Sequence, residues 1–131
     1  MKYLLDINSL IALAHQGHSH HVNVSRWFAS LVAASDTVLT CAITELGFVR
    51  VSVQAGLADD IRSAQATLTG MVESSTIPWK RVADGVGVSV MPSYVKKPSQ
   101  LTDAHLLELA RKNKAAFATL DTGIPGSLRL P

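Results

Sequence analysis

The sequence predicts an α/β fold in which a central, mostly parallel β-sheet is flanked by helices. Short apolar runs alternate with longer segments that repeat apolar residues at helical spacing, and this alternation is typical of such sheets. The chain has 131 residues, of which 47% are hydrophobic, so it is long and apolar enough to bury one core. We therefore expect one domain that covers residues 1–131.

The first part of the chain predicts two strands with two helices between them. Residues 2–5 form an apolar run that ends at Asp6, and they predict a buried strand. Residues 9–15 repeat apolar side chains at helical spacing, and a second helix is expected over residues 19–34, capped by its first residue. Residues 37–40 are a short β-branched run and predict the second strand.

The middle of the chain predicts two further helices. Residues 41–54 have the pattern of a helix that ends before Gly56. The acidic pair at residues 59–60 is suited to open another helix, because acids are favoured at helix N-termini. Residues 76–79 are expected to form a strand. Residues 82–91 mix glycine with valine and fit either a strand or a loop.

The last part of the chain predicts a loop, a helix and a strand. Residues 93–100 are polar and are expected to form an exposed loop. Residues 101–112 have a strong helical pattern with basic residues in the last turn. Residues 115–120 form a short apolar strand that ends at Asp121, and the tail over residues 122–131 is expected to be irregular.

Charge, cysteine content and hydropathy limit the class of protein. The net charge of +2 does not by itself indicate a nucleic-acid-binding protein. The single Cys41 cannot form an internal disulfide and suits a reducing compartment. Asp6 and Asn8 interrupt the apolar N-terminus, which argues against a secretion signal, and no run approaches the roughly 20 apolar residues that span a bilayer. We expect a cytoplasmic protein without a membrane partner.

Four acidic residues lie in apolar surroundings, where charged residues are rare unless they are paired or bind a metal. They are Asp6, Glu45, Asp103 and Asp121. Each also has a structural interpretation: a cap or turn at Asp6 and Asp121, a first-turn acid at Asp103, and a solvated helix position at Glu45. Because parallel sheets place ligand sites at the carboxyl ends of their strands, we expect Asp6 and Asp121 to converge.

Together the four acids fit one chemistry. Carboxylates at one edge of a sheet raise one another's pKa unless a hard divalent cation neutralises them, and Mg²⁺ and Mn²⁺ bind oxygen ligands of this kind. Such ions activate water and stabilise the leaving oxygen in reactions of phosphates. The sequence therefore predicts a metal-dependent site for phosphate chemistry.

The segments around the four acids occur in a recognisable order. They are DINSLIAL at Asp6, ITELGFVR at Glu45, LTDAHLLELA at Asp103 and ATLDTGI at Asp121. This series resembles the acidic motifs of PIN-domain ribonucleases, and among them the VapC-type toxins of bacterial toxin–antitoxin pairs, over nearly the whole chain. The chain departs from the family at Ile7, where a hydroxyl residue is common, and it lacks the further acid that some relatives have just after Asp121.

The resemblance implies a PIN fold and Mg²⁺- or Mn²⁺-dependent endonucleolytic cleavage of structured RNA, such as transfer or ribosomal RNA. It also implies a homodimer and neutralisation by a VapB-type antitoxin. The catalytic and metal-binding residues would be Asp6, Glu45 and Asp103, completed by Asp121. Asn8 and Thr119 would orient ligands or water. Because the extra acid is missing, a second metal is expected to bind weakly or only with RNA.

Two other functions compete with this one. A phosphatase of the haloacid dehalogenase type would use Asp6 as a covalent nucleophile, but it needs a second aspartate two residues later, where this chain has Asn8. A catalytically inactive PIN-like module would bind RNA or a protein without cutting. The four retained carboxylates argue against such a module, because a binding protein gains nothing from burying acids that repel one another.

Other conspicuous residues are interpreted as ordinary surface. The histidines of residues 15–21 are expected to lie in a solvated loop, because Gly17 breaks the helical register that a zinc site would need. Residues 79–81, Trp-Lys-Arg, could contact RNA phosphates or stack on a base, but surface charge and a half-buried tryptophan are favoured. The apolar stretches 24–31 and 48–53 are expected to be exposed faces for the dimer and antitoxin contacts.

Overall fold

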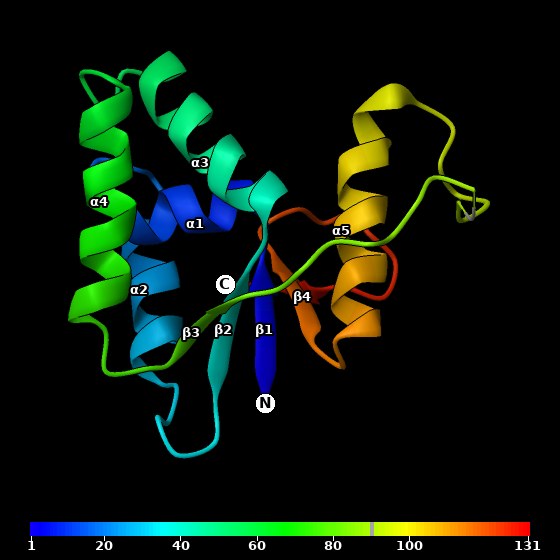
Figure 1. The fold of residues 1–131 in the computed structure, drawn as a ribbon, viewed down its shortest axis with the longest axis horizontal. Coiled ribbons are helices and arrows are strands. Elements are labelled where there is room, and N and C mark those ends of the chain that lie inside the picture. The colour runs from blue at the N-terminus through cyan, green and yellow to red at the C-terminus, as the bar shows by residue number, and fades with distance from the viewer. Residues whose placement is uncertain (90) are drawn as a thin grey trace.

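The sheet at the centre of the molecule is entirely parallel (Figure 1). The structure is a computed structural model that describes residues 1–89 and 91–131. The order of the strands is β3-β2-β1-β4-β5. Their bounds are β1 Lys2–Leu5, β2 Thr37–Thr40, β3 Trp79–Arg81, β4 Ala116–Thr119 and β5 Leu128–Arg129. The predicted parallel α/β sheet is therefore confirmed.

Helices cover both faces of the sheet (Figure 1). Their bounds are α1 Ile7–Ala14, α2 His21–Ala29, α3 Ala42–Gln54, α4 Ile61–Ser74 and α5 Leu101–Lys112, with a short 3-10 turn η1 at Pro98–Gln100. Alternate residues of a strand point to opposite faces, so Leu5 packs in the core with α1 to α4 while Leu4 packs with α5. Among the described residues, no helix is long and apolar enough to cross a bilayer.

The largest differences from the predicted boundaries are in α2 and β3. Helix α2 starts at His21 and ends at Ala29, five residues early, because the Asp36 carboxylate accepts the Val32 N–H at 2.8 Å and turns the chain toward β2. Strand β3 starts at Trp79 instead of residue 76, because local hydrogen bonds between Ser75 and Ile77 form a turn first.

The tail predicted to be irregular contains β5, which pairs with β4 through Thr119 and Arg129. Within residues 82–91 the described part forms no strand, and Val90 lies outside the described residues.

The contact between α1 and α3 corrects two further expectations. His15 is buried, donates or accepts a hydrogen bond with the Ser52 hydroxyl at 2.9 Å, and stacks on Phe48, so it does not lie in a solvated loop. Phe48 and Val24 are 0% exposed, so neither belongs to an exposed apolar face. Gly47 allows this close packing, since a Cβ there would lie 2.2 Å from Ile7 Cδ1.

Candidate active site

The carboxyl edge of the sheet gathers three of the four predicted acids. Asp6 follows β1 directly, and Asp121 comes two residues after the end of β4. Strands β1 and β4 are hydrogen-bonded neighbours with Leu5 opposite Ala118, so Asp6 lies beside Thr119. Asp103 is in the first turn of α5, as predicted. The expected convergence of Asp6 and Asp121 is therefore seen in the structure.

Asp6 is buried and fixed at both oxygens. Its Oδ1 accepts the Ser9 N–H at 2.7 Å and caps α1, while its Oδ2 accepts the Thr119 hydroxyl. The side chain is 5% exposed. Burial raises the pKa of Asp6, and the hydrogen bonds from Ser9 and Thr119 oppose that rise without cancelling it. The Asp6 carboxylate thus caps α1 and also belongs to the candidate site.

Thr119 joins Asp6 to Asp121. The Thr119 hydroxyl is fully buried, and besides donating to Asp6 it accepts the Asp121 N–H at 3.0 Å. The Asp121 carboxylate then accepts the Gly123 N–H at 2.8 Å, which is the turn predicted for this residue. These bonds hold the two acids in a fixed relation at the end of β4.

Asp103 experiences the negative charge of its neighbours. Burial, together with the carboxylates of Asp6 and Asp121, raises the pKa of Asp103 to about 6. Asp103 and Asp121 line a cavity of about 270 Å³, which the ring of Tyr94 also borders. The buried Tyr94 hydroxyl has no hydrogen-bond partner among the described residues. The cavity is therefore a half-buried acidic hollow with a polar group that lacks a partner.

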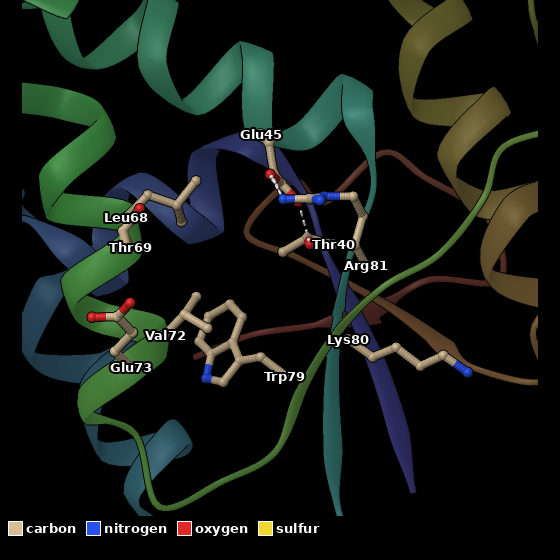
Figure 2. Close-up of a pocket in the computed structure, with 9 residues that line it drawn as sticks. All are labelled: Thr40, Glu45, Leu68, Thr69, Val72, Glu73, Trp79, Lys80 and Arg81. Atoms are coloured by element: carbon tan, nitrogen blue, oxygen red, sulfur yellow. Dashed lines mark hydrogen bonds and ion pairs between the residues drawn. The ribbon is translucent and has the colours of Figure 1, made fainter. Parts of the chain in front are cut away.

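Glu45 is engaged elsewhere, as Figure 2 shows. Its carboxylate accepts Arg81 Nε at 2.7 Å and Arg81 Nη2 at 2.8 Å, and it also accepts the Thr40 hydroxyl at 2.7 Å. These bonds, led by those from Arg81, hold the pKa of Glu45 below its ordinary value despite partial burial. Glu45 lies at the start of α3, next to the end of β2, but its carboxylate is paired with a cation and not with the other acids.

Asn8 lies in the first turn of α1, exposed to solvent. It lines a surface hollow of about 380 Å³ that it shares with Asp121 and with His18 and His20. The proposed orienting role of Asn8 is compatible with this place. Asp121 is the lining residue that this hollow shares with the cavity that contains Asp103.

The donor set at the sheet edge fits a hard divalent cation. In residues 1–89 and 91–131, Asp6, Asp103 and Asp121 form no ion pair with a basic side chain, so their charges have no protein counter-charge. Across the same residues, no group of three or more His, Cys, Asp or Glu side chains is already arranged to hold a metal ion. Oxygen ligands and uncompensated negative charge suit Mg²⁺ or Mn²⁺, which would draw the carboxylates together.

Two residues beside the acids were not assigned to the site from the sequence. Nothing in the sequence marks Tyr94, because it lies in a loop without periodicity. Arg81 stood out only as a basic residue after Trp79, and its pairing with Glu45 spans 36 positions of the chain. Such long-range contacts follow from strand pairing, here Thr40 opposite Arg81.

The raised pKa of Asp103 predicts a pH dependence of stability for the metal-free protein. The unfolded chain releases the Asp103 proton near the ordinary value of 3.8, whereas the folded state keeps it up to about 6. Between these values the folded state binds more protons, so this group makes the free energy of unfolding fall as the pH rises. Urea denaturation in EDTA, from about pH 4 to about pH 7, measures this fall in the free energy of unfolding. The fall should be smaller in Asp103→Asn than in the wild type, and it should be unchanged in the exposed control Asp59→Asn. Equal pH profiles for Asp103→Asn and the wild type would contradict it.

Comparisons with known proteins find curated relatives over most of the chain. No protein-family model matches the chain. Ribonucleases of Mycobacterium tuberculosis are among the proteins to which it is similar. VapC38 is 36% identical over 92% of this chain and 86% of its own. VapC39 is 32% identical over 97% of this chain and 94% of its own. VapC29 is 34% identical over 95% of this chain and 89% of its own.

A solved structure has the same fold. It is that of VapC20 from Mycobacterium tuberculosis, described as a sarcin-ricin loop cleaving toxin. The TM-score is 0.62 and the match covers 92% of this chain and 91% of that one, at 16% sequence identity. This likeness shows that the parallel sheet and its helices form a PIN fold.

Proposed function

Because this chain belongs to the VapC family of endoribonuclease toxins, we propose that the acids at its sheet edge form a divalent-metal-dependent centre for RNA cleavage. The observation that carries this proposal is the convergence of Asp6, Asp103 and Asp121 without a protein counter-charge. Three uncompensated carboxylates destabilise the fold, so a function is the simplest reason to retain them.

The roles of the residues follow from their contacts. Asp6 is held rigidly by Ser9 and Thr119, so it is the fixed ligand of the site. Asp103 and Asp121 border the open cavity and would complete the first metal site from α5 and β4. Thr119 orients both Asp6 and Asp121, and Asn8 contacts ligands that enter from the neighbouring hollow. When bound there, Mg²⁺ or Mn²⁺ supplies Lewis-acid stabilisation of a phosphodiester.

Glu45 is the fourth acid of the proposed set. Its assignment is supported by the segment ITELGFVR and by its position at the end of β2, beside β1. Its carboxylate becomes available to the site only if the Arg81 guanidinium moves to another anion. We therefore place Glu45 as a ligand whose contribution depends on substrate, whereas Asp6 and Asp103 act in every state.

Membership of the VapC family suggests the class of substrate and the protein partners of this chain. We propose structured RNA, such as transfer or ribosomal RNA, as the substrate, and a VapB-type antitoxin as the inhibitor. A homodimer is also proposed. Leu46 and Ile61 are exposed apolar residues of α3 and α4 that are available for protein contacts. Light scattering should then give twice the 14.0 kDa of one chain, and a mass of one chain at all concentrations would contradict the dimer.

The test of the metal requirement is cleavage of total cellular RNA by the purified protein. We expect discrete fragments with Mg²⁺ or Mn²⁺, and none with EDTA, because the acids cannot gather around a phosphate without a cation to offset their charge. Re-addition of Mn²⁺ to the EDTA-treated sample should restore the fragments. Equal cleavage with and without EDTA would contradict the metal-dependent centre. RNA binding without cleavage in any lane would favour the catalytically inactive module.

A further inference from the structure

A further hollow lies away from the three convergent acids, between β3 and α4 (Figure 2). It has a volume of about 240 Å³. Three side chains, Trp79, Leu68 and Val72, form an apolar wall, and Thr40, Thr69 and Arg81 add polar groups. At about 30 Å³ for each water, the volume corresponds to about eight waters, which is comparable with the number of heavy atoms in a nucleobase.

Arg81 is held at the mouth of this hollow with binding capacity left. Its Nε and Nη2 atoms donate to Glu45, and Thr40 holds the same carboxylate from β2, so the guanidinium is fixed in orientation. The Arg81 side chain is nevertheless 69% exposed. Of its five N–H donors, those of Nη1 take no part in the contacts described within residues 1–89 and 91–131. A fixed, exposed guanidinium with free donors is suited to a phosphate.

The hollow and the acidic site both lie at the carboxyl ends of strands of the sheet. Thr40 is the last residue of β2 and pairs with Arg81, the last residue of β3. Strand β2 also pairs with β1, which ends one residue before Asp6. Two strand spacings of about 4.8 Å each separate the backbone of Arg81 from that of β1. At about 3.4 Å per phosphate along one strand of a duplex, this separation of about 10 Å corresponds to about three nucleotides.

We propose that this hollow binds one unpaired nucleotide of the RNA substrate, with its base against Trp79, Leu68 and Val72 and its phosphate on Arg81. The proposal rests on the proposed function in so far as the substrate is RNA. Proteins that recognise RNA select unpaired bases and hold them against aromatic side chains and arginine. The mixture of an indole, two aliphatic side chains and hydroxyl groups fits a base better than a wholly apolar peptide side chain.

Charged side chains of both signs line the hollow, namely Arg81, Lys80, Glu45 and Glu73. The Arg81 charge is offset by Glu45, and Figure 2 shows the Glu73 carboxylate on the far side of the hollow from Arg81. The phosphate would take the free Nη1 donors of Arg81, so it leaves the pairing of Arg81 with Glu45 in place.

The test compares two matched substitutions on α4. Thr69→Trp fills the hollow, because Thr69 lines it, whereas Ala66→Trp places the same side chain on an exposed position of the same helix outside it. Binding is measured in EDTA by the anisotropy of a labelled single-stranded RNA of mixed sequence. We expect Thr69→Trp to weaken binding about tenfold or more, and Ala66→Trp to change it less than about twofold.

A direct measurement uses the fluorescence of Trp79 in a Trp27→Phe background, which leaves Trp79 as the one tryptophan of the chain. The same RNA, and nucleoside monophosphates as probes, should quench this emission, and the Thr69→Leu variant should retain most of the response. Unchanged Trp79 emission together with equal RNA binding by Thr69→Trp and Ala66→Trp would overturn the nucleotide subsite.

The outcomes separate this inference from the proposed function. Wild-type protein that cleaves RNA with Mn²⁺ while Thr69→Trp binds and cleaves like Ala66→Trp retains the nuclease and overturns the subsite. A Trp79 response to a peptide partner but to no RNA or nucleotide also overturns it. RNA-dependent quenching in a protein that never cleaves RNA supports the subsite and contradicts the catalytic proposal.

Discussion

Replacing Asp103 with asparagine is expected to abolish RNA cleavage while the protein remains folded. Asparagine keeps the size of the side chain but removes the charge that borders the cavity beside Asp121. Because loss of even an indirect partner of a metal ligand typically costs about 10–100-fold in activity, loss of the ligand itself should exceed about 100-fold. The measurement is the initial rate of cleavage in Mn²⁺, with Asp59→Asn, an exposed acid outside the site, as the control.

The Asp103→Asn change should lower the rate of cleavage without lowering the stability of the protein. Asp103 is repelled by Asp6 and Asp121, so its neutral replacement should leave the metal-free protein at neutral pH as stable as the wild type or more stable. A variant that is less active and more stable is the signature of a functional carboxylate. Cleavage at the wild-type rate by a folded Asp103→Asn protein would remove Asp103 from the catalytic set.

Asp6→Ala should also abolish cleavage, but with a different effect on stability. This change removes the cap of α1, which typically costs about 1 kcal/mol, and leaves the buried Ser9 N–H and Thr119 hydroxyl without their acceptor. Each unsatisfied buried group costs about 1–3 kcal/mol. Asp6→Asn keeps an acceptor oxygen and is therefore the variant in which activity and folding separate.

Phe48→Ala is expected to lower the free energy of unfolding by about 3–5 kcal/mol, the usual cost of removing a fully buried phenylalanine. Phe48 is 0% exposed and stacks on His15 between α1 and α3. Urea denaturation measures the loss, and the control is Leu46→Ala on the same helix, where a side chain that is 72% exposed should change stability by less than about 0.5 kcal/mol.

The same pair of variants tests whether Phe48 lies in the core or in an exposed surface for protein contacts. If Phe48 were part of a protein interface, Phe48→Ala would leave the stability of the separate chain nearly unchanged and would weaken the oligomer instead. A loss of stability below about 1 kcal/mol in Phe48→Ala would therefore contradict its place in the core. Leu46, which lies two positions before Phe48 on the same helix and outside the predicted stretch 48–53, is an exposed apolar residue.

Periodic and capped segments could be predicted closely from the sequence. Helix α5 has the predicted bounds of residues 101–112, since its apolar spacing and its last-turn basic residues both belong to the helix itself. Strands β1 and β2 also match, as short apolar runs between polar residues. In contrast, β5 has only two residues and exists because β4 pairs with it, so its own residues carry no signal.

The identity of the acids and their convergence were determined by the sequence, because each strand that ends in an aspartate must deliver it to the carboxyl edge of a parallel sheet. Thus Asp6 and Asp121 meet as expected, joined by Thr119. The pairing of Glu45 with Arg81 and the joint burial of His15 and Phe48 depend on long-range packing, and local sequence does not predict them. Local patterns report which face of an element is apolar, whereas partners far apart in the chain are selected by packing and strand pairing, which no single segment encodes.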